Sequence, residues 1–181
     1  MTRTSHLRSA MRSGTFVRFN RPFEEGPVHG YVVAVGPEFF LLALVSDHIR
    51  FNGFQAFRTI DVRNLRPDPF ATFVESALKK RHESKPRKHK VSVSSLRALL
   101  LSASRAFPLV AIHREKLDAD ICQIGRVVSV AAGRLSLLEI GPDAVWHAAP
   151  TRYALKQITR VDFGGEYEDA LHIVGGDPTA G

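Results

Sequence analysis

A dense run of cations is the part of this sequence whose residue types have the clearest chemistry. Residues 79–90 read KKRHESKPRKHK and hold seven Lys or Arg and one Glu, a local charge of +6. A segment so highly charged does not pack into a core, so we expect it to be solvated and mobile. It is then either a strap that contacts phosphate groups or a linker without a ligand. On the first interpretation, the side chains that contact phosphate are Lys79, Lys80, Arg81, Lys85, Arg87, Lys88 and Lys90.

The N-terminal segment carries a second concentration of positive charge. Residues 1–22 hold five Arg and no acidic residue, a local charge of +5. The whole chain carries +7, so everything outside these two segments is mildly acidic at −4. Charge placed in this way favours an electrostatic contact of an arm and a linker with a polyanion. Arg8 and Arg12 of the arm add to the linker cations if both segments lie on the same side of the molecule.

Aromatic side chains are the second candidate for contact with nucleic acid, because exposed rings stack on single-stranded bases. Most of them alternate along expected strands, and alternation of that kind is typical of core positions. Phe51 and Trp146 fall at an expected turn instead. These two rings are therefore the candidates for base stacking.

No arrangement typical of an enzyme or of a metal site is present in the sequence. The eight His residues are scattered without HxH or HxxxH spacing, and the single Cys122, expected to be a buried small hydrophobe, excludes a CxxC site. There is no GxSxG motif, and Gly164-Gly165 lacks the lysine of a phosphate-binding loop. Asp61 and Asp162 are expected to be solvated at strand ends. We therefore expect no enzymatic activity, no cofactor, no metal and no small-molecule substrate, unless residues distant in sequence assemble a site.

The composition places the chain among ordinary globular proteins. It has 181 residues, of which 44% are hydrophobic and 24% charged, enough for one medium domain or two small ones. The apolar run at residues 39–45 is far shorter than the ~20 residues that a membrane-spanning helix needs. The N-terminus has no apolar segment of signal-peptide length. We expect a cytoplasmic protein without membrane contacts.

The chain contains an internal repeat. A shift of 95 residues lays residues 30–35 on residues 125–130, and residues 40–45 on residues 135–140. The same shift lays Val17 on Ile112. With one inserted residue, Phe57, Val62 and Leu65 meet Tyr153, Ile158 and Val161, and the openings Ser5-His6-Leu7-Arg8 and Ser94-Ser95-Leu96-Arg97 also agree. Order and spacing are kept from end to end, which predicts two diverged copies of one small module.

Each copy predicts the same series of elements, which must position the cations and rings. A short helix opened by Ser or Thr is expected at residues 4–12 and 94–105. Five short strands follow, expected at residues 15–19, 29–35, 39–45, 54–60 and 62–65, and again at 109–113, 123–130, 135–140, 146–155 and 158–163. A last helix is expected at residues 69–81 and 166–174. Gly30 and Gly125 lie within the second strand, where a sharp bend leaves no room for a Cβ.

A helix followed by about five short antiparallel strands, the second bent at a glycine, resembles the Sm-like fold, a small SH3-like barrel. The chain also resembles uncharacterised bacterial proteins that carry such domains. The resemblance implies binding of U-rich RNA on rings of subunits. The Asp and Asn pair and the Arg-Gly or Lys-His pair of RNA-binding Sm proteins have no identifiable counterpart. Asn52-Gly53 and His147-Ala148 occupy the expected turn between the third and fourth strands, and they differ between the copies.

These observations together predict a mainly β protein with short helices. We expect two tandem Sm-like or SH3-like barrel modules, each with an N-terminal and a C-terminal helix. The first spans residues 1–81, a basic linker spans 82–93, the second module spans 94–176, and 177–181 form a disordered tail. The expected function is non-enzymatic binding of nucleic acid, RNA rather than DNA. The alternative is a protein-interaction or scaffolding module that assembles through barrel edge strands, with itself or with another protein.

Overall fold

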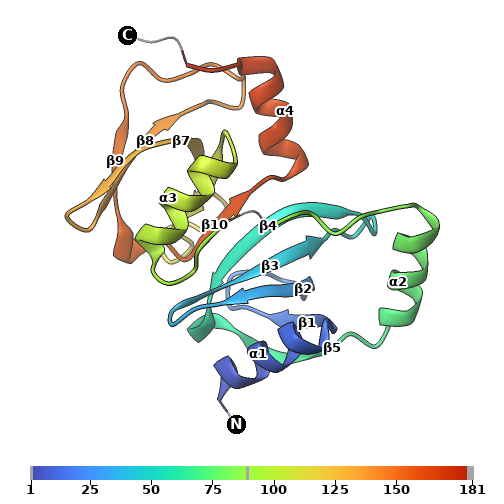
Figure 1. Cartoon of the computed structure of the whole chain (residues 1–181). Coiled ribbons are helices and arrows are strands. Elements are labelled where there is room, and N and C mark those ends of the chain that lie inside the picture. Colours follow the sequence, from blue (N-terminus) through green and yellow to red (C-terminus); the bar gives the residue numbers. More distant parts are fainter. Residues whose placement is uncertain (1, 89, 179–181) are drawn as a thin grey trace.

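The computed structural model describes residues 2–88 and 90–178, and it shows a mainly β protein, as the sequence predicts. Four α-helices are found in that part of the chain: α1 (Arg3–Ser13), α2 (Ala71–Lys80), α3 (Leu96–Ala106) and α4 (Glu166–Gly175). The strands are β1 (Phe16–Asn20), β2 (Val28–Val35), β3 (Phe39–Val45), β4 (Phe51–Arg58), β5 (Arg63–Pro67), β6 (Val110–His113), β7 (Cys122–Ala131), β8 (Arg134–Glu139), β9 (Thr151–Ala154) and β10 (Arg160–Phe163). We call α1 to α2 the first half and α3 to α4 the second half (Figure 1).

All ten described strands form one antiparallel sheet. Its order is β5-β1-β2-β3-β4-β10-β6-β7-β8-β9, and it does not close on itself. The expected pair of small barrels is therefore not confirmed. The physical reason is that β4 pairs with β10 from Phe54 to Phe57, so its main-chain groups are satisfied by the other half of the chain. We call this β4–β10 pairing the joint.

The internal repeat is visible in the sheet, because β10-β6-β7-β8-β9 has the order of β5-β1-β2-β3-β4. Gly30 pairs with Leu44 and Gly125 with Glu139, and the register of both hairpins shifts shortly after the glycine. A Cβ on Gly30 would lie 2.3 Å from the carbonyl oxygen of Ala43, and one on Gly125 would lie 2.1 Å from that of Leu138. Only glycine fits at either position.

The first strands match with a different offset from the one that the sequence predicts. Val17 pairs with Gly30, and its counterpart opposite Gly125 is Val110 rather than Ile112. The shift is thus 93 residues here instead of 95. An offset of two residues leaves every side chain on the same face of a strand, so the hydrophobic pattern could not reveal it.

The two N-terminal helices also match with a shift of 93 residues. The hydroxyl of Thr2 accepts a hydrogen bond from the Ser5 amide at 3.2 Å, and that of Ser95 accepts one from the Ala98 amide at 3.1 Å. These equivalent N-caps align the helices differently from the sequence comparison of their openings. The buried counterpart of Leu7 is therefore Leu100.

The end of the expected linker is packed against the first half. Val91 and Val93 are buried in the same hydrophobic cluster as Phe39 and Leu41 of β3. The Val93 carbonyl oxygen lies so close to Gly36 that a Cβ there would be 1.8 Å from it. The segment before it is anchored by Glu83, whose carboxylate accepts hydrogen bonds from the Arg50 guanidinium at 3.0 Å and the Phe51 amide at 3.2 Å. Within residues 79–90, Glu83 is therefore held by the first half, and the mobility of the other residues in that range stays a prediction.

The C-terminal end has two features that concern the expectations above. Residues 177 and 178 follow α4 without regular structure, whereas residues 179–181 of the expected tail lie outside the described residues. The expected strand at 146–155 is reduced to β9, and Trp146 makes only an isolated bridge with Ile140. Among the described residues, no helix has the length and apolar character needed to cross a membrane.

Candidate nucleic-acid interface

Five of the seven linker cations have no partner in the described part of the chain. Lys79 and Lys80 lie exposed in the last turn of α2, where their positive charge interacts favourably with the helix dipole. Arg87 and Lys90 are exposed and Lys88 is half-buried. None of the five forms an ion pair or hydrogen bond with a described residue. Their charges remain available to a ligand.

The other two linker cations are held by the fold. The Arg81 guanidinium donates to the carbonyl oxygen of Ile49 at 3.1 Å. The Lys85 ammonium lies 4.0 Å from the centre of the Tyr31 ring. Burial lowers the pKa of Lys85, and Glu75 opposes that effect. Both side chains are exposed, yet these contacts attach the segment to the first half.

The two aromatic candidates also contact their own half. Phe51 opens β4, and its half-buried ring lies 6.1 Å from that of Tyr31. The Trp146 indole donates to the carbonyl oxygens of Gly175 and Gly176 at 3.3 and 3.2 Å. Both rings therefore have structural contacts, and base stacking by either remains a prediction.

A groove between α1 and β5 brings further cations together, and we call it the basic groove. One part has a volume of about 550 Å³ and is lined by Arg3, His6, Arg63 and Asn64, with Val62 and Leu65. A second part of about 190 Å³ shares His6 and Leu65 and adds Arg66 and the hydroxyl side chains of Ser9, Ser13 and Thr15. Arg8 and Arg12 lie exposed on the same helix.

The described residues that line the basic groove include no acid. Arg3, Arg63 and Arg66 are exposed and form no ion pair with a described residue, whereas the nearby Asp61 carboxylate is bound to Arg58 at 2.7 and 2.9 Å. Guanidinium groups and hydroxyls are the donors that phosphate oxygens accept. Sequence reasoning missed Arg63 and Arg66. The sequence signal that could have indicated them is the presence of two arginines and no acidic residue in the last strand of the first copy.

Where the halves meet, by contrast, the described charged side chains form ion pairs with one another, although Arg21 Nε and one carboxylate oxygen of Glu24 have no hydrogen-bond partner. Arg21 and Glu115 are joined across the halves, with the Arg21 Nη1 atom 3.0 Å from Glu115 Oε1. The Arg160 Nε atom lies 2.8 Å from Asp162 Oδ1, and His113 Nε2 lies 3.0 Å from Asp162 Oδ2. Asp162 is thus buried in this cluster, not solvated as expected from its position at a strand end.

The pKa shifts in this cluster follow from burial and from these pairs. Burial acts to raise the pKa of Asp162, but the charges of Arg160 and His113 outweigh it and hold that pKa well below its usual value. Burial also acts to raise the pKa of Glu115, but the hydrogen bonds from Arg21 and Thr159 outweigh it and lower that pKa. The pKa of Glu24 is raised, chiefly by burial. Charges that satisfy one another in this way stabilise a fixed contact and are not free for a ligand.

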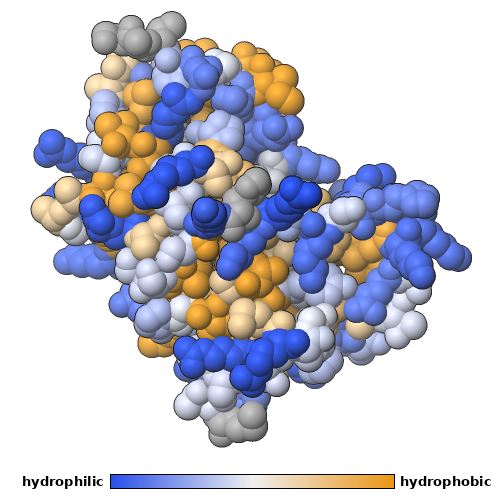
Figure 2. Space-filling view, in the orientation of Figure 1, coloured by the Kyte–Doolittle hydropathy of each residue, from blue (hydrophilic) through white to orange (hydrophobic). Residues whose placement is uncertain are grey.

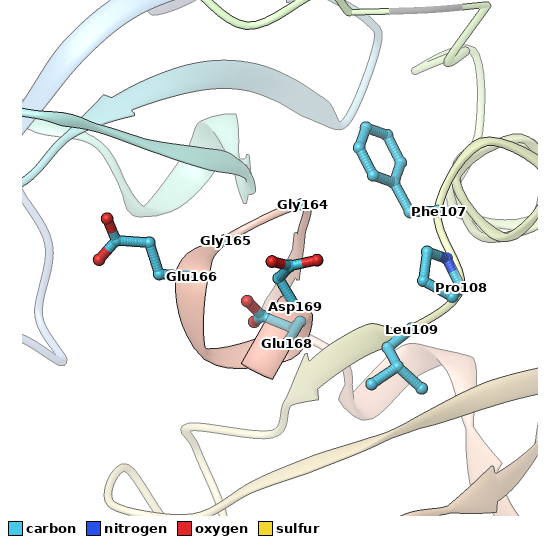
Figure 3. Close-up of a pocket in the computed structure, with 8 residues that line it drawn as sticks. All are labelled: Phe107, Pro108, Leu109, Gly164, Gly165, Glu166, Glu168 and Asp169. Carbon is cyan, nitrogen blue, oxygen red and sulfur yellow. The ribbon is translucent and has the colours of Figure 1, made fainter. Parts of the chain in front are cut away.

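A hollow of about 290 Å³ lies beside the N-terminus of α4 (Figure 3). The close-up shows Phe107, Pro108 and Leu109 on one side and the acidic side chains of the first helical turn on the other. Those acidic residues are Glu166, Glu168 and Asp169. Negative charge at this helix end excludes the phosphate group that a helix N-terminus otherwise attracts.

Two further kinds of side chain could carry chemistry, the single cysteine and the potential metal ligands. Cys122 is exposed, contrary to the expectation of a buried residue, because it opens β7 where the strand leaves a surface loop. Among residues 2–88 and 90–178, no three His, Cys, Asp or Glu side chains converge so as to hold a metal ion.

No protein-family model matches the chain, and neither a curated protein nor a solved structure matches it. The functional argument therefore depends on the surface chemistry of the molecule itself.

Proposed function

We propose that the protein binds nucleic acid, RNA rather than DNA, without catalysing a reaction. The observation that carries this proposal is the basic groove, whose arginines are exposed and unpaired among the described residues and whose described lining includes no acid. Surface cations in proteins are ordinarily interspersed with acidic residues, which offset them. A surface of one sign attracts a polyanion and contacts its phosphates.

The groove and the linker cations belong to the same half of the molecule. β5 ends at Pro67 and α2 begins at Ala71, so the groove arginines are followed closely along the chain by Lys79 and Lys80. Figure 2 shows strongly hydrophilic side chains over α2 and the segment after it, and again over α1. A strand of RNA that follows the edge of the first half would meet both groups of cations.

The choice of RNA is supported by the construction of each half. A capped helix precedes five strands, and the second strand passes through a glycine that its neighbour's carbonyl oxygen approaches closely. These are the features on which the resemblance to Sm-like domains depends. Our proposal includes that each half is an Sm-like module and that the two modules share one sheet through the joint.

The edge strands support nucleic-acid binding over assembly of copies. The free edges of the sheet are β5 and β9. β5 exposes Arg63, Asn64 and Arg66, and β9 has four residues and exposes Arg152. Short edge strands with charged side chains resist pairing with another chain. The same arginines that discourage a further strand are those that a phosphate backbone would contact.

The test is binding of labelled single-stranded oligouridine to the full chain at several salt concentrations. The groove variant carries Arg3→Gln, Arg63→Gln and Arg66→Gln. Its matched control removes three exposed cations of the second half by Arg105→Gln, Lys116→Gln and Lys156→Gln. Each lost phosphate contact lowers the slope of log affinity against log salt by about 0.7 for a single strand, so the groove variant should lose about 2. The control should keep the wild-type slope.

Two outcomes would overturn the proposal. One is a wild-type protein that binds neither oligouridine nor single-stranded DNA at low salt. The other is a groove variant and a linker variant (Gln at residues 79, 80, 87, 88 and 90) that both bind like the control. The ratio of absorbance at 260 and 280 nm before and after a high-salt wash gives a first check, since co-purified nucleic acid is removed by salt. Protein that is free of nucleic acid and stays oligomeric at high salt would favour assembly instead.

A further inference from the structure

The two halves differ on the face of the sheet to which Ala34, Leu41 and Ala56 belong in the first half, and we call this the outer face. In the first half, Ala34 of β2 pairs with Leu41 of β3, and Leu41 pairs with Ala56 of β4. All three side chains are buried, in one cluster with Phe39. Val91 and Val93 belong to that cluster, so the extended segment before α3 covers the outer face there.

The second half repeats this register with side chains of a different kind. Ser129 of β7 pairs with Ser136 of β8, and Ser136 pairs with Arg152 of β9. The repeat places these three residues at the positions of Ala34, Leu41 and Ala56. Arg134 likewise stands at the position of Phe39, so two arginines and two serines replace four buried apolar residues.

These side chains surround a shallow hollow of about 240 Å³. Ala131 and Ala132 complete its lining, which includes no acidic residue among those described. Ser129, Arg134 and Arg152 are exposed and Ser136 is half-buried. Neither arginine forms an ion pair or hydrogen bond with a described residue, so both guanidinium groups are available.

The donors around the hollow select the kind of ligand. Two guanidinium groups and two hydroxyls can all donate hydrogen bonds, and the arginines add two positive charges. A tetrahedral group whose negative charge is shared by two accepting oxygens, such as a phosphodiester, fits such a set, and arginine binds it with two parallel hydrogen bonds. That chemistry is the chemistry of a phosphate group.

We infer that the outer face of the second half binds a backbone phosphate of the same nucleic acid that the basic groove binds. The inference depends on the proposed function and extends it, because the nucleic acid then contacts both halves. The joint would fix the spacing between the two contact regions. Oligonucleotides too short to reach both regions would use one of them at a time.

The experiment uses the full chain and labelled oligouridines of increasing length. The test variant carries Arg134→Gln and Arg152→Gln, and the matched control carries Arg105→Gln and Lys156→Gln on the same half. The test variant should lose about 0.7 in the salt slope with long oligouridine, because the hollow contacts one phosphate, and the control should lose nothing. With the shortest oligouridines that bind, the loss should be smaller. A second variant, Ser129→Ala with Ser136→Ala, should weaken binding of long oligouridine without changing the salt slope, because it removes donors but no charge.

The outcomes separate this inference from the proposed function. If wild type binds and the groove variant is impaired, but the Arg134 and Arg152 variant binds long oligouridine like its control, the inference is wrong and the proposed function stands. If wild type binds no nucleic acid at all, both are wrong. Thermal unfolding and circular dichroism of each variant should match wild type, because the replaced arginines are exposed.

Discussion

The joint and the free edge of the first half are built from matched elements, yet side chains at matched positions differ in kind. On the side of the joint, the elements of the second half to be compared are its first helix, α3, and its last strand, β10, which pairs with β4. At the free edge, the matched elements of the first half are α1 and β5, and no described strand pairs with the outer side of β5. The repeat lays Leu96 and Leu99 of α3 on Arg3 and His6 of α1. The leucines are buried, whereas Arg3 and His6 are exposed and line the basic groove.

The last strands show the same contrast. The repeat lays Thr159, Arg160 and Asp162 on Arg63, Asn64 and Arg66. The first three residues belong to the paired cluster of the joint, and the other three are exposed. One backbone arrangement therefore makes a fixed contact where its side chains are apolar or paired. Where the matched positions are cationic and unpaired among the described residues, it leaves a basic surface, which is the one that we propose binds nucleic acid.

The largest expected effect comes from Asp162→Asn at the joint, with Arg66→Gln as the matched change at the free edge. Removing one partner of a buried pair leaves Arg160 and His113 without their carboxylate, so Asp162→Asn should cost about 3–5 kcal/mol of the free energy of unfolding at pH 7. Arg66→Gln should change it by less than about 0.5 kcal/mol. Urea unfolding measures both. Equal effects would mean that the two regions do not differ as described.

The same pair predicts a dependence on pH. Since the folded state lowers the pKa of Asp162, its contribution is complete above the unfolded value of about 4 and is lost as pH falls towards the lowered folded value. The difference between wild type and Asp162→Asn should therefore be constant from pH 7 to about pH 5 and shrink at more acidic pH. A difference that grew on acidification would contradict the pairing with Arg160.

The helices offer the next test. Leu99→Ala removes a fully buried side chain and should cost about 2–5 kcal/mol, while the matched His6→Ala should change the free energy of unfolding by less than about 0.5 kcal/mol. Denaturant unfolding of both variants measures the contrast. Leu7→Ala and Leu100→Ala remove buried leucines at equivalent positions and serve as a matched control pair, which should be destabilised to a similar degree.

The glycines test what the two halves share. Gly30→Ala and Gly125→Ala each place a Cβ against a backbone carbonyl oxygen, so each should cost about 1–3 kcal/mol or more. Gly26→Ala is the control, because a Cβ at Gly26 meets nothing within 4 Å. Thermal unfolding of the three variants should place Gly26→Ala beside wild type. A mild effect at only one of the two strand glycines would weaken the equivalence of the halves.

The smallest expected effect concerns the helix caps. Ser95→Ala should lower the global stability by about 1 kcal/mol, because Phe107, the C-cap residue of α3, packs against Phe54 and Phe163 at the joint. Thr2→Ala should have less effect on global unfolding, since α1 packs on one half only and can fray by itself. Amide hydrogen exchange distinguishes the two: faster exchange confined to α1 is expected for Thr2→Ala. Identical global losses would show that α1 is as firmly integrated as α3.

The sequence predicted the repeat, the mainly β character and the glycine bends, because these depend on local spacing. It did not predict the single open sheet. Main-chain pairing between β4 and β10 leaves no mark in residue types, since an apolar strand such as residues 54–57 suits a barrel and a joint equally. The sequence comparison misaligned the first strands by two residues, because a shift of two preserves the alternation of apolar and polar side chains.

The candidate site was predicted in part. The linker cations were found from their density, and five of the seven are unpaired among the described residues. Arg63 and Arg66 were missed because two separated arginines in a strand look like ordinary surface residues until α1 is placed beside them. Asp162 was assigned to solvent because its burial depends on Arg160 and His113, and His113 lies 49 residues away along the chain.

The joint also has a consequence for the size of the protein. It is a head-to-tail contact, in which one edge of a module meets the opposite edge of the next, and a contact of this kind leaves an unused edge at each end. Repeated without limit, it would make a growing filament, with every added unit exposing a new site for addition. Both ends oppose pairing with a further strand, because β5 exposes Arg63 and Arg66 and β9 is short and carries an arginine. They oppose the addition of a strand to the ten that the described residues form, and under the proposed function the same charges would contact phosphate.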